Sequence, residues 1–189
     1  LGISDLLPNG EGIAEIDGRR VQVRNALTGE LVRARILKKK KGIKFADAIE
    51  VVRSSKERGD IACKSFPRCG GCSMLHMLPA KEVELKSKKL RTDLKNRKIV
   101  FQETLDPVVN NFLHYRRKAR LGVKCLGDTV LVGFRESFSS RVARIEACKI
   151  LTHGLSALIP HLKETISQCS IKQFIPQIEV AEGDQARAI

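Results

Sequence analysis

The chain has 189 residues, 42% of them hydrophobic, which is enough for one or two small domains with their own cores. Its formal charge of +14 favours a polyanionic partner, and nucleic acid is favoured over a membrane because no stretch is apolar enough to span one. Six cysteines are too few for a disulfide scaffold, and no apolar leader opens the chain, so we expect a cytoplasmic protein. We also expect a monomer. A basic surface without any ligand is the alternative.

The first part of the chain predicts short strands joined by glycine turns. Asp17-Gly18 is a two-residue hairpin signal, and in 31–37 apolar and basic residues alternate as they do on a half-buried strand. Four or five such strands predict a small barrel of the oligonucleotide-binding (OB) type. The expected fold class is therefore mainly β with α+β, with an OB-like barrel over 1–53 and an α+β domain over 54–189.

A basic run lies between the last two strands of this predicted barrel. Its four lysines are candidate RNA contacts, because a short stretch of like charges attracts a polyanion. A solvated loop is the alternative interpretation of the run. The residues are Lys38, Lys39, Lys40 and Lys41.

Three cysteines fall within ten residues, in the pattern C-x5-C-G-G-C over residues 63–72. Gly70 and Gly71 allow backbone with positive φ, so that the flanking cysteines can aim their sulfurs at one point. A disulfide pair with one spare thiol is the alternative, which a reducing compartment disfavours. The pattern predicts a metal centre held by Cys63, Cys69 and Cys72.

The spacing leaves the metal and the fourth ligand open. Zinc sites usually come as two facing pairs of ligands, whereas three clustered cysteines with one remote ligand are common in iron–sulfur centres, which favours iron and sulfide. Cys125 and Cys169 lie in patterns typical of packed small residues. Cys148 follows a predicted strand, where a loop could reach a metal, and is therefore the preferred fourth ligand.

The remaining elements alternate between helix and strand. A helix is predicted over 79–97, with Pro79 in its first turn and Val83, Leu90 and Leu94 as its buried stripe. A second helix follows from the apolar spacing within 155–166. Further strands are predicted over 130–135, 142–146 and 174–181.

From residue 114 the pattern has a period of two and predicts a basic strand. Tyr115, Ala119, Leu121 and Val123 are expected on the buried face. Cations two residues apart repeat at roughly 6.6 Å, a spacing suited to a phosphate backbone. An ordinary solvated sheet face is the alternative. The candidate RNA contacts here and in the next strand are Arg116, Lys118, Arg120, Lys124 and Arg135.

Several blocks in order resemble the RumA-like (RlmD-type) RNA uracil-C5 methyltransferases. The cysteine loop is followed by Ser73-Met74-Leu75-His76, and Gly10-Glu11-Gly12-Ile13-Ala14 is similar to their N-terminal TRAM domain. Two later blocks also match the family: Tyr115-Arg116-Arg117-Lys118-Ala119-Arg120, and Gly133-Phe134-Arg135 leading to Cys148-Lys149-Ile150-Leu151. The resemblance covers essentially the whole chain.

The resemblance implies that Cys63, Cys69, Cys72 and Cys148 hold a [4Fe-4S] cluster. It also implies that the TRAM and central domains bind folded 23S ribosomal RNA, while a separate Rossmann-like domain binds S-adenosylmethionine. In the family the nucleophile, the base and the cofactor loop lie beyond the matching region, and no G-x-G-x-G follows a strand here. We therefore expect the RNA-recognition portion of an rRNA (uracil-5-)-methyltransferase, a piece of something longer, with no catalytic or cofactor-binding residues of its own.

Two other functions are compatible with the sequence. A relative with the same two domains can act on transfer RNA, and a stand-alone RNA-binding protein could carry zinc in the cysteine loop. Radical-SAM enzymes, some of which have TRAM domains, use a C-x3-C-x2-C loop, and the C-x5-C-x2-C pattern here argues against them.

Overall fold

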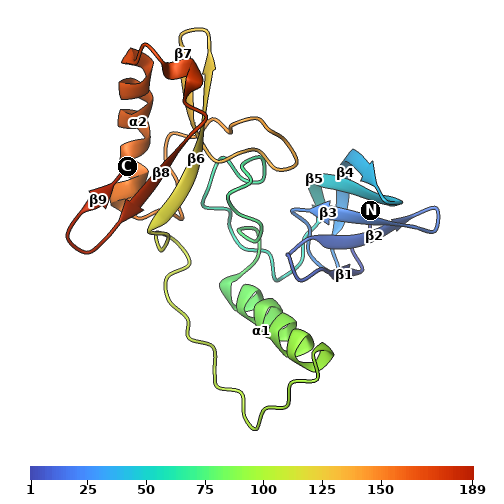
Figure 1. Cartoon of the computed structure of the whole chain (residues 1–189). Helices are drawn as coiled ribbons and strands as arrows, with labels where there is room; N and C mark the ends of the chain where they lie inside the picture. Colours follow the sequence, from blue (N-terminus) through green and yellow to red (C-terminus); the bar gives the residue numbers. More distant parts are fainter. The chain divides into compact units, whose positions relative to one another are not determined.

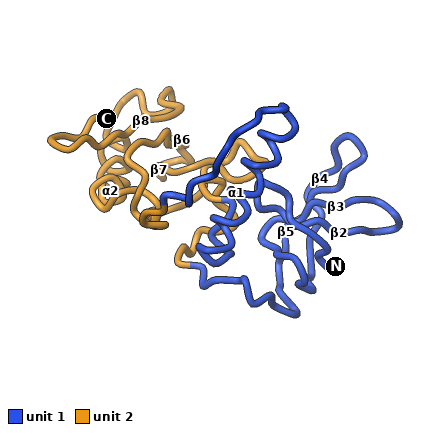
Figure 2. Tube along the Cα trace, turned by 90° about the horizontal axis from the view of Figure 1, so that it is seen from below, with its two compact units in different colours: residues 1–61, 73–108 blue, residues 62–72, 109–189 orange.

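A computed structural model describes residues 1–189, and its secondary structure confirms the predicted mainly β fold class with α+β (Figure 1). Contacts divide the chain into two compact units (Figure 2). Unit 1 comprises residues 1–61 and 73–108, and unit 2 comprises 62–72 and 109–189. The cysteine loop thus belongs with the later part of the chain. The division into domains after residue 53 stays a prediction.

Unit 1 contains a five-stranded sheet of order β1-β2-β3-β5-β4. β3 and β5 pair in parallel, and the other neighbours are antiparallel. Gly2 bridges to Leu31, so the segment that leads into β1 also contacts the opposite edge of the sheet, the connection that a small closed barrel needs. The strands are β1 (Asp5–Leu6), β2 (Gly12–Ile16), β3 (Arg19–Arg24), β4 (Leu31–Lys40) and β5 (Ile43–Arg53).

Two hairpin turns shape the basic end of this sheet. Asp17 and Gly18 both have positive φ (51° and 68°), which confirms the predicted hairpin. Lys41 and Gly42 form a similar turn, with φ of 49° and 81°. The loop interpretation of the lysine run is therefore wrong for residues 38–40, which continue β4, and only Lys41 lies in the turn.

Helix α1 (Pro79–Asn96) agrees with the predicted helix to within one residue. Its predicted buried stripe is only partly correct, because Val83 and Leu94 are half-buried, whereas Leu90 is 60% exposed and Leu85 is the buried residue. Leu85 packs with Leu27 and Met77 in a small core of unit 1, separate from the core inside the sheet. The helix therefore contacts its unit through one short region and exposes most of its basic surface.

A buried ion pair ties the end of the sheet to the segment after it. Glu30 is fully buried and accepts hydrogen bonds from the Leu27 N–H at 2.8 Å and the Ser55 N–H at 3.2 Å. Arg58 donates to both Glu30 oxygens at 2.7 Å, and Arg58 also bonds Asn25. Burial alone would raise the pKa of Glu30, but the Arg58 bond and the two N–H donors hold it below its ordinary value. The carboxylate therefore stays charged inside the fold.

His76 lies beside this pair and should make the stability of unit 1 depend on pH. Burial, reinforced by Arg58, lowers the pKa of His76 to about 4 from an ordinary 6.5. Only the unfolded chain then binds a proton between these two values, so stability is complete above pH 6.5 and decreases as the pH falls toward 4. The loss should reach about 3 kcal/mol, measured by denaturant unfolding across that range. A His76→Leu variant should lack this slope, and an equal slope in the variant would contradict the assignment.

Unit 2 contains a four-stranded antiparallel sheet of order β7-β6-β8-β9 with helix α2 (His153–Gln168) packed against it. The predicted apolar spacing of α2 is confirmed by its buried residues Leu155, Ile159, Leu162 and Ile166. The other elements are β6 (Lys118–Leu126), β7 (Thr129–Gly133), a 3-10 turn (Lys172–Phe174), β8 (Gln177–Glu182) and β9 (Arg187–Ala188).

Two strand predictions in unit 2 need correction. Residues 142–146 form no strand, although Val142 bridges to Arg135 and the Ala143 N–H donates to the Phe134 carbonyl at 2.9 Å. This segment buries its apolar side chains without a continuous ladder. The strand predicted from residue 174 begins at 177, because Phe174 ends the 3-10 turn.

Candidate metal centre and nucleic-acid interface

The cysteine loop docks onto the chain that follows β7. Cys69 bridges to Glu136, and the Gly70 N–H donates to the Arg135 carbonyl at 2.9 Å. The Cys69 N–H turns back to the Ser65 carbonyl at 2.8 Å, which closes the loop on itself. The loop is thereby held against the same segment that leads to Cys148.

The two glycines of the loop serve close approach rather than positive φ. Neither Gly70 nor Gly71 has a positive φ, so the predicted reason for them is wrong. A Cβ on Gly70 would lie 2.7 Å from the Arg135 carbonyl oxygen, and one on Gly71 would lie 2.9 Å from the Phe134 ring. Any side chain would therefore push the loop away from residues 134–135.

All four predicted cysteine ligands lie in unit 2, and their thiols interact with one another. Burial, followed by the charges of Cys148, Cys69 and Cys63, raises the pKa of Cys72 to about 12, against an opposing effect of Arg116. Burial also raises the pKa of Cys69, with further contributions from Cys148 and Cys63. Such crowded thiols would ionise together only if a positive centre lay among them.

Cys148 is the most buried of the four, and it is bonded to the first turn of α2. Its N–H donates to the Ser156 hydroxyl at 2.9 Å. The two competing cysteines make local bonds instead, from the Cys125 thiol to the Lys172 carbonyl and from the Cys169 thiol to the Thr165 carbonyl, both at 3.4 Å. All six cysteines are free thiols, and no three Cys, His, Asp or Glu side chains converge as the ligands of a single metal ion.

The predicted basic strand is only partly regular. Lys118, Arg120 and Lys124 lie on the exposed face of β6 while alternate residues are buried, as predicted. The strand begins at Lys118, however, so Tyr115 lies outside it and is 56% exposed rather than buried. Arg116 also precedes the strand, and its guanidinium lies 5.0 Å from the centre of the Phe134 ring.

Glu179 on β8 lies directly opposite Arg120 and was not predicted as part of this surface. It forms ion pairs with Arg120 and, at 3.7 Å, with Lys118. The Arg120 hydrogen bond and the charges of both cations lower the pKa of Glu179. One carboxylate therefore offsets part of the charge of two predicted RNA contacts. Alternation along the strand predicted over 174–181 could have placed Glu179 on this face.

Lys124 and Arg135 belong to a different basic surface in unit 2. They line a groove of about 1110 Å³ together with four basic side chains that were not predicted. These four come from the cysteine loop and from the segment after β7. A pattern within one strand cannot show that residues of two distant segments share a surface. They are Lys64, Arg68, Arg141 and Arg144.

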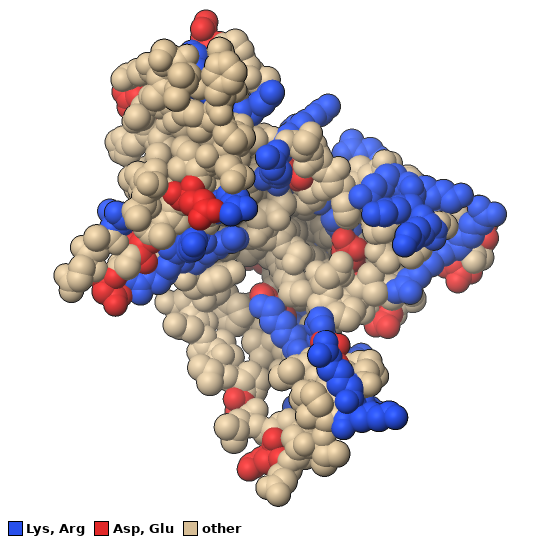
Figure 3. Space-filling model, in the orientation of Figure 1, with Lys and Arg blue, Asp and Glu red and all other residues tan.

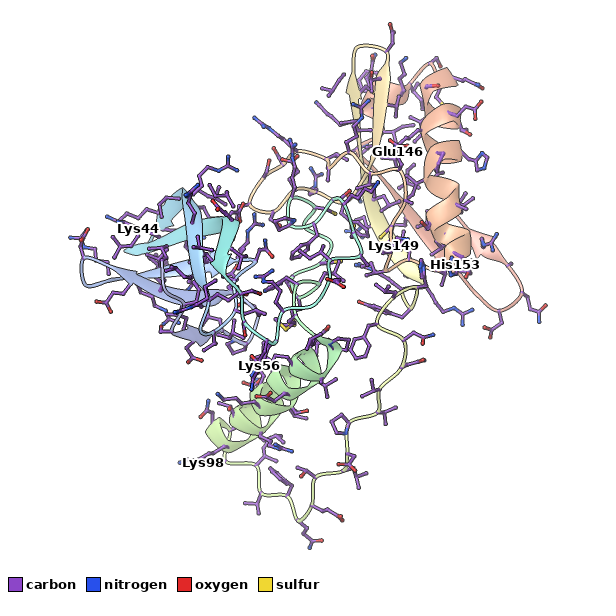
Figure 4. The ribbon with its side chains drawn as sticks, turned by 180° about the vertical axis from the view of Figure 1, so that it is seen from behind. Lys44, Lys56, Lys98, Glu146, Lys149 and His153 are labelled. Carbon is purple, nitrogen blue, oxygen red and sulfur yellow. The ribbon has the colours of Figure 1, made fainter.

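In unit 1 the predicted lysines gather on the β4–β5 hairpin. Figure 3 shows basic side chains concentrated over these strands. Lys38 lies 5.3 Å above the Phe45 ring, and Lys39 is paired across the hairpin with Lys44, labelled in Figure 4. Lysine and an aromatic ring side by side suit a nucleic-acid backbone and base.

Comparison with known proteins places the chain beside one group of enzymes. It is 38% identical over 191 residues to the 23S rRNA (uracil(1939)-C(5))-methyltransferase RlmD of Nitrosococcus oceani, covering 99% of this chain and 43% of that protein. It is 39% identical over 192 residues to the RlmD of Alkalilimnicola ehrlichii, covering 100% of this chain and 43% of that protein. Over its whole length the chain is similar to RlmD-type methyltransferases. The resemblance read from the sequence is thereby confirmed.

The chain spans less than half the length of these RlmD relatives. No protein-family profile matches it. Among solved structures, the Pyrococcus abyssi tRNA (uracil-54, C5)-methyltransferase in complex with S-adenosyl-L-homocysteine shares its fold, with a TM-score of 0.64 and 22% identity over 98% of this chain and 43% of that one. None of the helices is both long and apolar enough to cross a bilayer.

Proposed function

We propose that this chain is the RNA-recognition portion of an S-adenosylmethionine-dependent methyltransferase that forms 5-methyluridine in 23S rRNA. The observation that carries the proposal is the match of the whole chain to RlmD-type enzymes that are named for this substrate. Basic surfaces in both units support it, because a formal charge of +14 on a small chain attracts a phosphate backbone. S-adenosylmethionine is assigned to a part of the protein outside these residues.

A tRNA substrate is the second candidate, since the structural neighbour acts on tRNA. Because that likeness is one of fold, the closer rRNA relatives favour 23S rRNA. The two can be separated by titrating the chain with a 23S fragment around the equivalent uracil and with unmodified tRNA. Incubation with S-adenosylmethionine and either RNA should give binding without methyl transfer by this chain alone. Methylated product would overturn the assignment of catalysis to residues outside it.

We further propose that Cys63, Cys69, Cys72 and Cys148 hold a [4Fe-4S] cluster. These cysteines are half-buried or buried, Cys69 and Cys72 pack against the core cluster that contains Cys148, and the charge of Arg116 acts on Cys72. The donor set therefore fits a thiolate-bound, positively charged centre. Such a cluster would supply a covalent link between the cysteine loop and the segment that precedes α2, which is a structural role. Gly70 and Gly71 allow the loop to lie close to residues 134–135.

The predicted contacts on β6 can be tested through their carboxylate neighbour. If Lys118 and Arg120 contact phosphates, Glu179 competes with RNA for them. A Glu179→Gln variant should therefore bind a single-stranded RNA oligonucleotide severalfold more tightly at low salt, with a steeper salt dependence. The measurement is a fluorescence-anisotropy titration. An affinity and salt slope equal to those of the unmodified chain would remove Lys118 and Arg120 from the interface.

A further inference from the structure

The groove in unit 2 is lined by basic and apolar residues. Lys64 and Arg68 come from the cysteine loop, and Arg135, Arg141 and Arg144 come from the segment after β7. Lys124 of β6 also lines the groove, with Leu131 paired to it on β7. The groove therefore joins residues from three separate parts of the sequence.

The charge of the groove is not balanced by the protein. Six basic side chains line it against one carboxylate, that of Glu136. Glu136 pairs with Arg68 at 2.6 Å, and Arg135 donates to the Ser140 carbonyl at 2.8 Å. The other four cations take part in no ion pair of the structure, and all four are exposed: Lys64, Lys124, Arg141 and Arg144. Cations held together in this way repel one another until a polyanion neutralises them.

We propose that this groove binds a single strand of RNA through its phosphate backbone. Cations of the cysteine loop and of the segment after β7 can contact successive phosphates, and the hydroxyls of Ser65, Thr129 and Ser140 in the lining are further donors. No aromatic side chain lines the groove, so bases are not held by stacking, and recognition depends on charge with little sequence preference. The inference rests on the proposed function, because it names the part of the chain that the RNA follows.

The groove differs from the interface predicted from the sequence. Lys118 and Arg120 lie at the other end of β6 and share Glu179, whereas Lys124 lies at the groove end without a carboxylate partner.

Arg141 and Arg144 are the most informative residues to change. Both side chains are exposed and neither takes part in an ion pair, so their loss should not disturb the fold.

The test is the double variant Arg141→Ala/Arg144→Ala, titrated with a single-stranded RNA oligonucleotide over a range of salt concentrations. Loss of two phosphate contacts should reduce the slope of log affinity against log salt by about 1.4. If the affinities converge at 1 M salt, the variant binds about 25-fold more weakly at 0.1 M. An Arg141→Lys/Arg144→Lys variant should recover most of the binding, and its recovery also shows that the segment folds.

The matched control is Lys149→Ala, which changes an exposed cation of the same unit (labelled in Figure 4). Lys149 is not among the residues that line the groove. This variant should bind RNA as the unmodified chain does. If the unmodified chain binds RNA and the double arginine variant binds equally well, the groove is not the RNA path and the proposed function survives. If the unmodified chain binds no RNA at low salt, both proposals are wrong. If the unmodified chain binds polyglutamate as tightly as it binds the RNA oligonucleotide, the groove would be assigned to an acidic peptide and the inference would be overturned.

Discussion

Replacing Arg58 with alanine should lower the free energy of unfolding by about 3–5 kcal/mol, because it leaves a buried carboxylate without its partner. Glu30 is fully buried, and Arg58 bonds both of its oxygens as well as Asn25. The two backbone N–H donors that remain cannot replace a guanidinium charge. Denaturant unfolding followed by circular dichroism measures the effect.

An exposed ion pair of the same unit provides the matched control. Arg33 and Glu50 pair at 2.7 Å, with their side chains 70% and 51% exposed. Arg33→Ala should cost less than about 1 kcal/mol, since exposed pairs contribute little. Removing both charges of the buried pair, with Glu30→Gln and Arg58→Met, should restore part of the stability lost in Arg58→Ala. A cost for Arg58→Ala as small as that for Arg33→Ala would show that the pair does not tie 54–61 to the sheet.

Replacing Cys148 with serine should leave the chain without a stable iron–sulfur cluster. Cys148 is the one proposed ligand that lies outside the cysteine loop, and its thiol raises the pKa of both Cys69 and Cys72. Without it only the loop cysteines remain, and the loop is then held to residues 134–136 by backbone contacts alone. Iron and acid-labile sulfide, determined on protein prepared without oxygen, should both fall to a small fraction of the values for the unmodified chain.

Cys169→Ser is the control for the cluster. Cys169 is half-buried like the loop cysteines, but its thiol bonds the carbonyl of its own helical turn. This variant should retain the full iron and sulfide content. A complete, stable cluster in the Cys148→Ser protein would show that another residue is the fourth cluster ligand. Zinc without iron or sulfide in the unmodified chain would replace the cluster with the zinc site considered from the sequence.

The sequence predicted best those features that depend on local periodicity. Helix α2 follows directly from apolar residues at helical spacing, and the hairpin at Asp17-Gly18 follows from turn chemistry that few other residues allow. Strand β6 was predicted with its exposed cations, but Tyr115 was placed wrongly because the ladder begins only at Lys118. Local patterns define the face of an element more reliably than its first residue.

Features that depend on distant contacts could not be predicted in the same way. Gly70 and Gly71 are needed because backbone and ring atoms some 65 residues later press against them, a reason that the loop's own sequence does not contain. Glu179 reaches the β6 cations only through the pairing of β6 with β8. Of the groove residues, Arg144 lies in the segment 142–146 that was predicted as a strand, and Arg141 lies just before it. Neither position in that pattern indicates that both residues share a surface with Lys64.

The affinity of the chain for a 23S rRNA fragment around the uracil modified by its relatives tests the central claim most directly. The account predicts binding by the 189-residue chain without any other domain, stronger for this fragment than for tRNA of similar length, and weakening steeply as salt increases. Absence of binding at low salt, or binding whose strength does not change with salt, would contradict the claim that these residues recognise RNA.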